Sequence, residues 1–247
     1  MYVKRLIISK DKHVRPLIDL HRSIHLSDGT LRREDLVAAD HRGIVPTTTG
    51  EPKLLAPATF KDSYDKMKRT AATIIPKDIG FIIAETGLTK DAVVIDAGGG
   101  SGAVTTQLAA LCKRVYSYDI NENHLNTIAE NCKRLDLDNV IIKPEDLITA
   151  QPPEKVDLLV LDMPDPSKAL TFAKRALKQS GFVVAYTPHI TQAQLFADSL
   201  DQDFKLVTTI ELMQRRWEVS DGKLRPKHNM LGHTAFLTFA RLFKWLR

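Results

Sequence analysis

The residues most suited to chemistry are an aspartate and four glycines near the middle of the chain. Asp96 ends an apolar run, and Gly98, Gly99, Gly100 and Gly102 follow it. Glycine-rich turns between a buried strand and a helix let backbone N–H groups approach a ligand closely. The segment therefore predicts a loop that binds a nucleoside-type ligand rather than a turn that only connects two elements.

Two classes of nucleoside cofactor use such a loop. Gly98, Gly100 and Ala103 satisfy the dinucleotide pattern, so a nicotinamide enzyme is an open alternative. The tighter spacing that ends at Gly102 suits a methionine moiety lying along the backbone. Asp96, two residues before the first glycine, can orient the loop near a cationic sulfonium and amino group. These features favour S-adenosylmethionine as the cofactor.

Further acids follow the next apolar runs. Asp119 follows a run at 115–118 and is predicted to accept the ribose hydroxyls, with a helix N-cap as its alternative role. Asp146 follows a third run and is predicted to accept from the adenine amino group, a role that the adjacent Glu145 fits equally. In open α/β sheets ligands bind at the carboxyl edge, where all these residues fall.

The segment Asp162-Met163-Pro164-Asp165-Pro166 indicates the chemical end of the site, because its prolines hold the chain extended beyond a strand. A ring nitrogen attacks a methyl group through its lone pair, so no proton has to leave first. A carboxylate such as Asp162 then orients the base and stabilises the developing charge. The alternative is that Asp162 and Asp165 cap the next helix. Tyr186, after a fifth strand, is predicted to stack on or enclose a flipped base.

These residues need an α/β sheet to position them. From residue 92 onward, fully apolar runs alternate with amphipathic stretches of about ten residues, the pattern of a parallel sheet covered on both faces. Strands are expected at 93–96, 115–119, 140–142, 156–162 and 182–186. Helices are expected at 103–112, 122–134, 168–178 and 192–200.

The two ends of the chain depart from this alternation. Residues 1–66 lack helical periodicity and predict a small β-rich domain, with strands that include 3–9, 36–39, 43–49 and 53–55. Residues 67–247 form the catalytic domain. A charged helix over 60–70 links the two, and Pro76 starts the next helix. Residues 206–217 and 234–242 predict an antiparallel pair of strands at the sheet edge.

Charge is distributed unevenly along the 247 residues. The net charge is +5 overall, but it is +5 over residues 1–69, −6 over 70–212 and +6 over 213–247. An acidic middle between basic ends suits a cationic small-molecule site beside polyanion-binding surfaces. The two cysteines, Cys112 and Cys132, lack the spacing of a metal site and are expected to be free thiols. No apolar run reaches the roughly 20 residues of a membrane helix, so a cytoplasmic protein is expected.

The ordered motifs resemble those of the tRNA (adenine-N1)-methyltransferase family, in its archaeal and bacterial homo-oligomeric branch. The resemblance covers roughly residues 35 to 242. The most distinctive motifs lie in the tail, which reads Arg-Arg-Trp-Glu-Val at 215–219 and Met-Leu-Gly-His-Thr-Ala-Phe-Leu at 230–237. Other matching motifs are Ile-Pro-Lys-Asp at 75–78, the loop at 96–103, Tyr-Asp at 118–119, Leu-Asp-Met-Pro-Asp-Pro at 161–166 and Tyr-Thr-Pro at 186–188.

The resemblance implies a Rossmann-like class I S-adenosylmethionine-dependent methyltransferase, a homotetramer, and tRNA as the partner. The target would be N1 of adenine 58 in the T-loop, and often also of adenine 57 in archaeal members. The residues implied to contact the cofactor are Gly98, Gly100, Ser101, Gly102, Ala103, Val104, Asp119, His124, Asp146 and Asp162. Asp162 would also be the catalytic carboxylate. Those assigned to the substrate are Tyr186, Arg215, Arg216 and His233. No metal is expected.

The chain departs from the family pattern at two positions. Many members carry a glutamine and an aromatic residue where this chain has Ala72 and Ile75, in the segment that helps to enclose the target adenine. Two other functions stay open: a methyltransferase for another substrate, such as a corrin ring or a protein, and a non-catalytic tRNA-binding subunit. The first leaves the basic ends unexplained, and the second leaves Asp119 and Asp162 unexplained.

Overall fold

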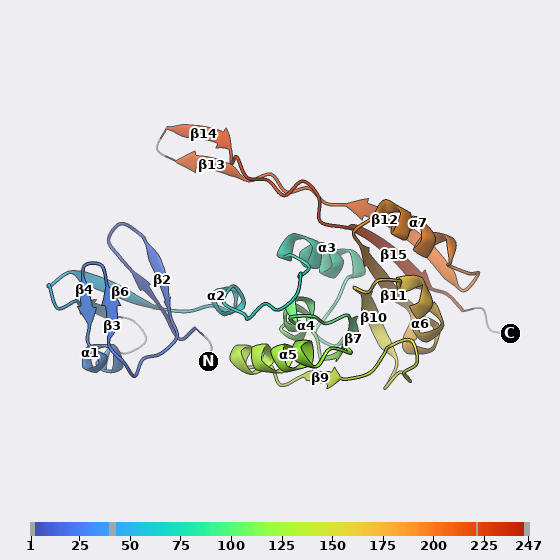
Figure 1. The fold of residues 1–247 in the computed structure, drawn as a ribbon, viewed down its shortest axis with the longest axis horizontal. Helices are drawn as coiled ribbons and strands as arrows, with labels where there is room; N and C mark the ends of the chain where they lie inside the picture. Colours follow the sequence, from blue (N-terminus) through green and yellow to red (C-terminus); the bar gives the residue numbers. More distant parts are fainter. Residues whose placement is uncertain (1–2, 40–42, 221, 245–247) are drawn as a thin grey trace. The chain divides into compact units, whose positions relative to one another are not determined.

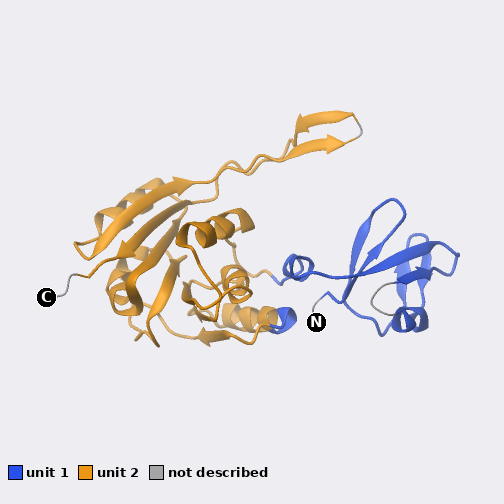
Figure 2. Cartoon of the chain, turned by 180° about the vertical axis from the view of Figure 1, so that it is seen from behind, with its two compact units in different colours: residues 1–68, 133–136 blue, residues 69–132, 137–247 orange. Residues whose placement is uncertain are grey.

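A computed structural model describes residues 3–39, 43–220 and 222–244. The chain divides into two compact units, coloured separately in Figure 2. The smaller unit holds the described residues up to Lys68 together with residues 133–136. The larger unit holds the remainder, from Arg69 onward. From the sequence we expected the boundary after residue 66.

The smaller unit is built on an antiparallel sheet in the order β2-β1-β6-β5. These strands are β1 (Arg5–Ile8), β2 (Val14–Leu17), β5 (Gly43–Pro46) and β6 (Pro52–Pro57). A separate hairpin pairs β3 (Ile24–Leu26) with β4 (Gly29–Leu31). Apolar side chains from these elements form one core, which includes Ile7, Leu17, Leu31, Leu36, Val45 and Leu55. The β-rich character expected of this region is confirmed.

Two short helices complete the smaller unit. The strand expected over 36–39 is wrong, because these residues belong mainly to α1 (Arg33–Ala38). Acidic residues Glu34 and Asp35 fill its first turn, where the helix dipole favours negative charge. Helix α2 (Phe60–Tyr64) begins at a capping box between Thr59 and Asp62. It ends well before residue 70, so the linking helix is shorter than expected.

The larger unit contains a seven-stranded sheet in the order β12-β15-β11-β10-β7-β8-β9, shown in Figure 1. Its parallel strands are β7 (Val93–Ala97), β8 (Arg114–Tyr118), β9 (Val140–Lys143), β10 (Val156–Leu161) and β11 (Leu177–Thr187). The two remaining strands, β12 (Phe204–Glu211) and β15 (Phe236–Leu242), join antiparallel at one edge. The predicted Rossmann-like sheet and its antiparallel edge pair are confirmed.

Among the described residues from Arg69 onward, six segments are helical. They are α3 (Pro76–Thr86), α4 (Ala103–Ala109), α5 (Glu122–Leu135), the 3-10 helix η1 (Pro166–Ala169), α6 (Leu170–Ala176) and α7 (Ile190–Asp198). Helix α3 starts with Pro76 at its first position and ends at Gly87, which adopts the left-handed conformation. The helix expected over 168–178 is shorter, because strand β11 already begins at Leu177.

Both faces of the sheet are buried, as its fully apolar strands predict. Alternate residues of one strand enter different cores, so Ile95 packs in one cluster and Val94 in the other. The first cluster includes Phe172 from α6 and Phe196 from α7. The second includes residues of α3 and α4, such as Ile82 and Leu108.

The basic tail is more ordered than the sequence indicated. The strand expected over 206–217 ends at Glu211, and a separate hairpin follows, formed by β13 (Trp217–Ser220) and β14 (Lys223–Pro226). The intervening Gln214, Arg215 and Arg216 are exposed and leave the sheet. Figure 1 shows that this hairpin lies away from the sheet at the end of two extended segments.

Three further observations bear on the class of protein. No helix among the described residues is long and apolar enough to cross a membrane. No group of three or more His, Cys, Asp or Glu residues in the described part of the chain is arranged to hold a metal ion. Cys112 and Cys132 are free and buried, which confirms the expectation of free thiols.

Candidate active site

The order of the strands places the carboxyl end of β7 at a topological switch point. The chain continues from β7 to β8 and β9 on one side, and then returns to β10 and β11 on the other. Loops that leave β7 and β10 therefore diverge, which is where open α/β sheets bind ligands. The predicted residues of the Gly loop, Asp119, Asp162 and Tyr186 come from the ends of four neighbouring strands.

The glycine loop is packed tightly between the ends of β8 and β10. The N–H groups of Gly98 and Gly99 both donate to the carbonyl oxygen of Tyr118, at 3.0 Å each. Gly98 has a φ of 83°, and a Cβ there would lie 1.8 Å from the carbonyl oxygen of Asp162. Position 98 therefore accepts only glycine in this arrangement.

Asp96 lies beneath this loop, away from the cavity that the loop borders. Its carboxylate accepts a hydrogen bond of 2.5 Å from Thr105 Oγ1, and Thr105 lies 2.8 Å from Ser117 Oγ. The residue is 1% exposed, and burial raises its pKa to about 6. Asp96 does not line the cavity above the loop, and its expected role in orienting the loop stays a prediction.

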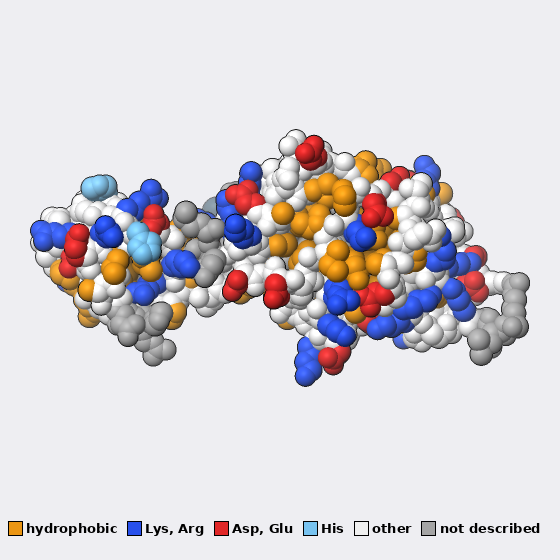
Figure 3. Space-filling view, turned by 90° about the horizontal axis from the view of Figure 1, so that it is seen from below, with side chains coloured by type: hydrophobic (Ala, Val, Ile, Leu, Met, Phe, Trp, Pro, Cys, Tyr) orange, Lys and Arg blue, Asp and Glu red, His pale blue; other side chains and the backbone are white. Residues whose placement is uncertain are grey.

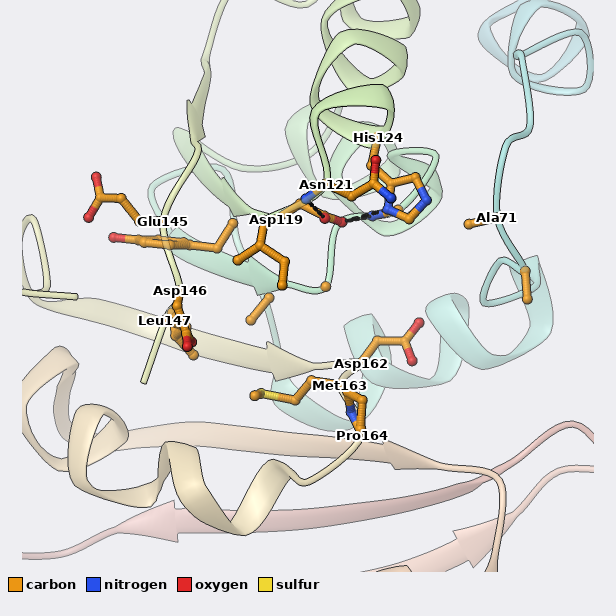
Figure 4. A pocket seen from close by; sticks show the side chains of 16 residues that line it. Ala71, Asp119, Asn121, His124, Glu145, Asp146, Leu147, Asp162, Met163 and Pro164 are labelled. Carbon is orange, nitrogen blue, oxygen red and sulfur yellow. Dashed lines mark hydrogen bonds and ion pairs between the residues drawn. The ribbon is translucent and has the colours of Figure 1, made fainter. Parts of the chain in front are cut away.

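A cavity of about 430 Å³ opens above the loop. Its lining residues come from the segment before α3 and from the ends of β7, β8, β9 and β10. They are Ala71, Ala72, Ala97, Gly98, Gly100, Tyr118, Asp119, Ile120, Asn121, His124, Glu145, Asp146, Leu147, Asp162, Met163 and Pro164. Figure 4 shows Asp119 and His124 facing one another, while Asp162 reaches the cavity from the opposite side at the end of β10.

Asp119 is the most connected polar side chain of this cavity. Its Oδ2 accepts from Gly100 N at 2.9 Å and lies 3.1 Å from His124 Nδ1. Its Oδ1 accepts from Asn121 N at 2.8 Å. A carboxylate offers about four lone-pair positions, so these contacts orient Asp119 and leave room for a ligand hydroxyl.

The predicted cofactor residues fall into two groups. Those that line the cavity are Gly98, Gly100, Asp119, His124, Asp146 and Asp162. Those outside its lining are Ser101, Gly102, Ala103 and Val104. Ser101 Oγ instead accepts from the backbone N–H groups of Thr70 and Ala71, at 2.8 and 3.1 Å, and Val104 packs in the apolar core.

Sequence reasoning missed the apolar walls of the cavity. Ile120 and Leu147 directly follow the predicted acids Asp119 and Asp146, and both line the space. Ile120 is 78% exposed, so its side chain is accessible to a ligand in the cavity. The sequence signal that could have revealed them is the apolar residue that directly follows each strand-end acid.

Asp162 stands at the end of β10, and its backbone N–H donates to Ala97 O at 2.8 Å. Burial raises the pKa of its carboxyl to about 7, and the negative charge of Asp96 adds to this effect. Its neighbour Asp165 occupies the N-cap position of η1 without a side-chain capping hydrogen bond, and its Oδ1 accepts from Ser167 Oγ at 2.5 Å.

A second cavity of about 400 Å³ adjoins the first. It is lined by Ala72, Thr73, Ile74, Ile75, Asp162, Tyr186, Pro188, Leu231, His233 and Thr234. Ala72 and Asp162 line both cavities. The predicted residues Tyr186 and His233 are thus brought to Asp162, together with the segment at 72–75 in which the chain departs from the family pattern.

His233 joins three segments at the rim of this second cavity. Its Nδ1 lies 2.5 Å from Glu211 Oε1, and its Nε2 lies 2.8 Å from Pro188 O. A carboxylate and a carbonyl can only accept, so these two contacts favour the ring with hydrogen on both nitrogens. The contact with Glu211 accordingly raises the pKa of His233 above its usual value.

The two predicted arginines lie elsewhere. Arg215 and Arg216 are exposed in the segment between β12 and β13, and neither lines a cavity. The guanidinium of Arg215 lies 5.9 Å from the ring centroid of Trp217. The predicted substrate residues therefore form two groups. Tyr186 and His233 line the second cavity with Asp162, whereas Arg215 and Arg216 lie on the tail.

A Rossmann-like sheet with a nucleoside-sized cavity at its switch point, adjoined by a second cavity at a shared carboxylate, defines an S-adenosylmethionine-dependent methyltransferase. Residues 65–225 match the family described as the tRNA methyltransferase complex GCD14 subunit, and this chain belongs to that family. That assignment confirms the resemblance noted from the motifs.

Known proteins agree with this assignment. The tRNA (adenine(57)-N(1)/adenine(58)-N(1))-methyltransferase TrmI of Methanocaldococcus jannaschii is 34% identical over 78% of this chain and 79% of its own. The tRNA (adenine(58)-N(1))-methyltransferase TrmI of Thermus thermophilus is 33% identical over 89% of each chain. A crystal structure of an S-adenosylmethionine-dependent O-methyltransferase from Thermotoga maritima superposes with a TM-score of 0.84 and 26% identity, over 99% of this chain and 94% of that one.

Proposed function

We propose that this chain transfers the methyl group of S-adenosylmethionine to N1 of adenine in the T-loop of tRNA, at position 58 with position 57 as a second target. The observation that carries the proposal is the junction of the two cavities at Asp162. A methyl donor and an acceptor base must meet within bonding reach, and a shared carboxylate marks that meeting point. The activities named for the relatives support the substrate.

The first cavity fits the donor. S-adenosylmethionine, when bound, supplies an electrophilic methyl group carried on a sulfonium. Gly98 and Gly100 border this cavity with backbone alone, so a ligand can lie along the loop. Asp119 is oriented to accept the ribose hydroxyls, and Ile120 with Leu147 offers apolar surface to a flat base. Asp146 is our choice for the adenine amino group, with Glu145 as the alternative.

The second cavity fits the acceptor. Ile75, Leu231 and the Tyr186 ring offer it apolar walls. We assign Asp162 to accept a hydrogen bond from the exocyclic amine of the target base. Its negative charge also stabilises the positive charge that develops on N1 as the new bond forms. Because the attacking lone pair lies in the ring plane, no residue has to remove a proton before attack.

Primer extension tests the proposal directly. Methylation of N1 blocks Watson–Crick pairing, so unmodified tRNA treated with protein and donor should give a reverse-transcription stop in the T-loop. Asp162→Asn should slow the appearance of the stop by about 10²- to 10³-fold. Asp165→Asn is the matched control, because Asp165 binds Ser167 and Lys168 rather than lining the junction. Full read-through by donor-saturated wild-type protein would exclude the function.

One competing reaction has its own support. The similar protein from Thermotoga maritima is named an O-methyltransferase, and an oxygen nucleophile needs a base to take its proton. Asp162, with its pKa near 7, is suited to such a role. Mass spectrometry of nucleosides from the treated tRNA separates the two, since N1-methyladenosine and ribose-methylated adenosine elute differently. A non-catalytic subunit would yield neither product and would fail to bind the donor.

The same proposal includes the assembly and the site of action. One face of the larger unit exposes a gathering of apolar side chains bordered by charged ones, which Figure 3 shows. Contact between copies would cover such a face, in keeping with the homotetramer that the resemblance implies. The exposed basic residues of the tail, around Arg216, are proposed to contact tRNA phosphates. A cytoplasmic location follows from the substrate.

A further inference from the structure

A buried ion pair lies behind the second cavity, and the proposed chemistry does not use it. Lys77, at the start of α3, donates from Nζ to Asp78 Oδ1 at 2.6 Å and to Thr234 Oγ1 at 2.8 Å. The side chain of Lys77 is 10% exposed and that of Asp78 is 0% exposed. Burying charges is costly unless good partners compensate, so an ion pair here calls for a role beyond stability.

The ammonium fixes the direction of hydrogen bonding around Thr234. An ammonium group has donors only, so Thr234 Oγ1 accepts from Lys77 and its own hydrogen must point elsewhere. Tyr186 is a neighbouring side chain that interacts with Thr234. Both residues line the second cavity with Asp162. This direction leaves the Thr234 hydroxyl able to donate to the phenol oxygen of Tyr186.

This direction determines what Tyr186 offers to a ligand. Once the phenol oxygen accepts from Thr234, the phenol hydrogen is left to donate into the cavity. Burial raises the pKa of Tyr186 to about 12, so the hydroxyl keeps its hydrogen at neutral pH. The cavity then presents an acceptor on Asp162 and a donor on Tyr186.

We propose that Lys77 is a positioning residue which, through Thr234, orients the Tyr186 hydroxyl as a hydrogen-bond donor to the acceptor base. The inference rests on the proposed function, since it assigns a base to the second cavity. Adenine supplies an amine hydrogen for Asp162 and unprotonated ring nitrogens for Tyr186. Guanine carries a carbonyl oxygen in place of that amine, so the pair of groups selects for adenine.

A double-mutant cycle on Thr234 and Tyr186 tests the link. Thr234→Val keeps the shape but loses the hydroxyl, whereas Thr234→Ser keeps the hydroxyl. With saturating donor, we expect Thr234→Val to lower kcat on tRNA about 10-fold and Thr234→Ser to stay within about 3-fold of wild type. In the Tyr186→Phe background, Thr234→Val should cause no further loss. Independent, multiplying losses would overturn the inference, as would equal losses in the Ser and Val variants.

The role of Lys77 is tested by comparing its substitution with the same substitution at a control lysine, Lys90. Lys77→Met should lower kcat as Thr234→Val does, and Lys90→Met, on an exposed turn, should not. Calorimetric titration with S-adenosylmethionine should give an unchanged donor Kd in every variant, which separates positioning of Tyr186 from general damage. If Lys77→Met loses no more activity than Lys90→Met, the inference is wrong while the proposed function stands. An inactive wild-type enzyme would overturn both.

Discussion

Gly98 packs directly against the backbone of Asp162, so that a Cβ on residue 98 would lie 1.8 Å from the Asp162 carbonyl oxygen. These two residues end adjacent parallel strands, β7 and β10, and the backbone N–H of Asp162 donates to Ala97 O in the same register. These main-chain contacts tie the glycine loop to Asp162, whose carboxylate lines both cavities. A shift of the loop would move Asp162 with it.

The first prediction is that Gly98→Ala abolishes donor binding and lowers the melting temperature. The added methyl group meets main-chain atoms of Asp162 that cannot move without breaking the sheet, and φ is positive at this position. Gly80→Ala is the matched control, because nothing lies within 4 Å of its added Cβ inside α3. That control should raise stability by about 0.5–1 kcal/mol and keep donor binding. Calorimetric titration and thermal melting measure both, and unchanged donor affinity in Gly98→Ala would contradict the packing argument.

A second prediction concerns Asp119. Asp119→Asn should raise the donor Kd about 10- to 100-fold, because hydrogen bonds to a charged group are lost and the amide N–H₂ would oppose the N–H of Gly100. Titration with S-adenosylmethionine measures this effect, and tRNA affinity should stay unchanged. Asp138→Asn, at an exposed position, serves as control. A donor Kd within 2-fold of wild type would remove Asp119 from the ribose role.

Titration with S-adenosylmethionine also decides between Asp146 and Glu145 as the partner of the adenine amino group. Asp146 Oδ1 already accepts from Ile148 N at 2.9 Å, and Glu145 lies 3.5 Å from Lys143. Both carboxylates line the donor cavity. We expect one of the two variants, Asp146→Asn or Glu145→Gln, to weaken donor binding more than the other. The residue changed in that variant is the partner of the adenine amino group.

Much of this arrangement could be predicted from the sequence, because it depends on local patterns. Apolar runs alternating with amphipathic stretches predict the parallel strands, and Pro76 and Gly87 mark the two ends of α3. Strand-end acids such as Asp119 and Asp162 fall at one edge of the sheet by topology alone. Short polar strands are harder to predict: β2 contains Arg15 and Pro16, which match no apolar alternation.

The site itself depends on contacts between residues that are far apart in the sequence, and these could not be predicted. Ala72 and Asp162 are 90 positions apart, and no local pattern indicates that they line the same junction. The sequence likewise does not indicate that the Asp96 carboxylate accepts from Thr105, which in turn contacts Ser117. The hairpin of β13 and β14 could not be predicted from the sequence, because the charged residues around it are typical of a loop.

A third prediction is that donor affinity rises with pH through about 7. Burial raises the pKa of Asp162 to about 7, with the charge of Asp96 contributing, and a cationic sulfonium binds the ionised carboxylate better than the neutral acid. The donor Kd should fall from pH 6 to pH 8 and then level off. His124 lines the same cavity, so the comparison must be made with Asp162→Asn, in which the fall should be much smaller. S-adenosylhomocysteine, which lacks the sulfonium charge, is the matched ligand and should respond less to pH.

The same raised pKa determines the sign of a stability effect in the donor-free protein. Folded Asp162 holds its proton more tightly than the unfolded chain does, so its contribution to stability is complete below about pH 4 and is lost as pH rises toward 7. Over that window the wild-type melting temperature should decline relative to that of Asp162→Asn. Parallel melting curves for the two proteins would contradict the assigned ionisation.

The fourth prediction concerns the basic tail. Arg215 and Arg216 lie exposed between β12 and β13, away from both cavities, so they are expected to act on tRNA phosphates rather than on the base. Each phosphate contact contributes roughly 0.7–0.9 to the slope of log K against log salt. The double variant Arg215→Gln with Arg216→Gln should lower that slope by about 1 to 2 and leave the donor Kd unchanged. The pair Lys90→Gln with Lys113→Gln removes the same charge from exposed positions elsewhere on the larger unit. If both double variants change the salt slope equally, the tail has no specific contact with tRNA and only net charge matters.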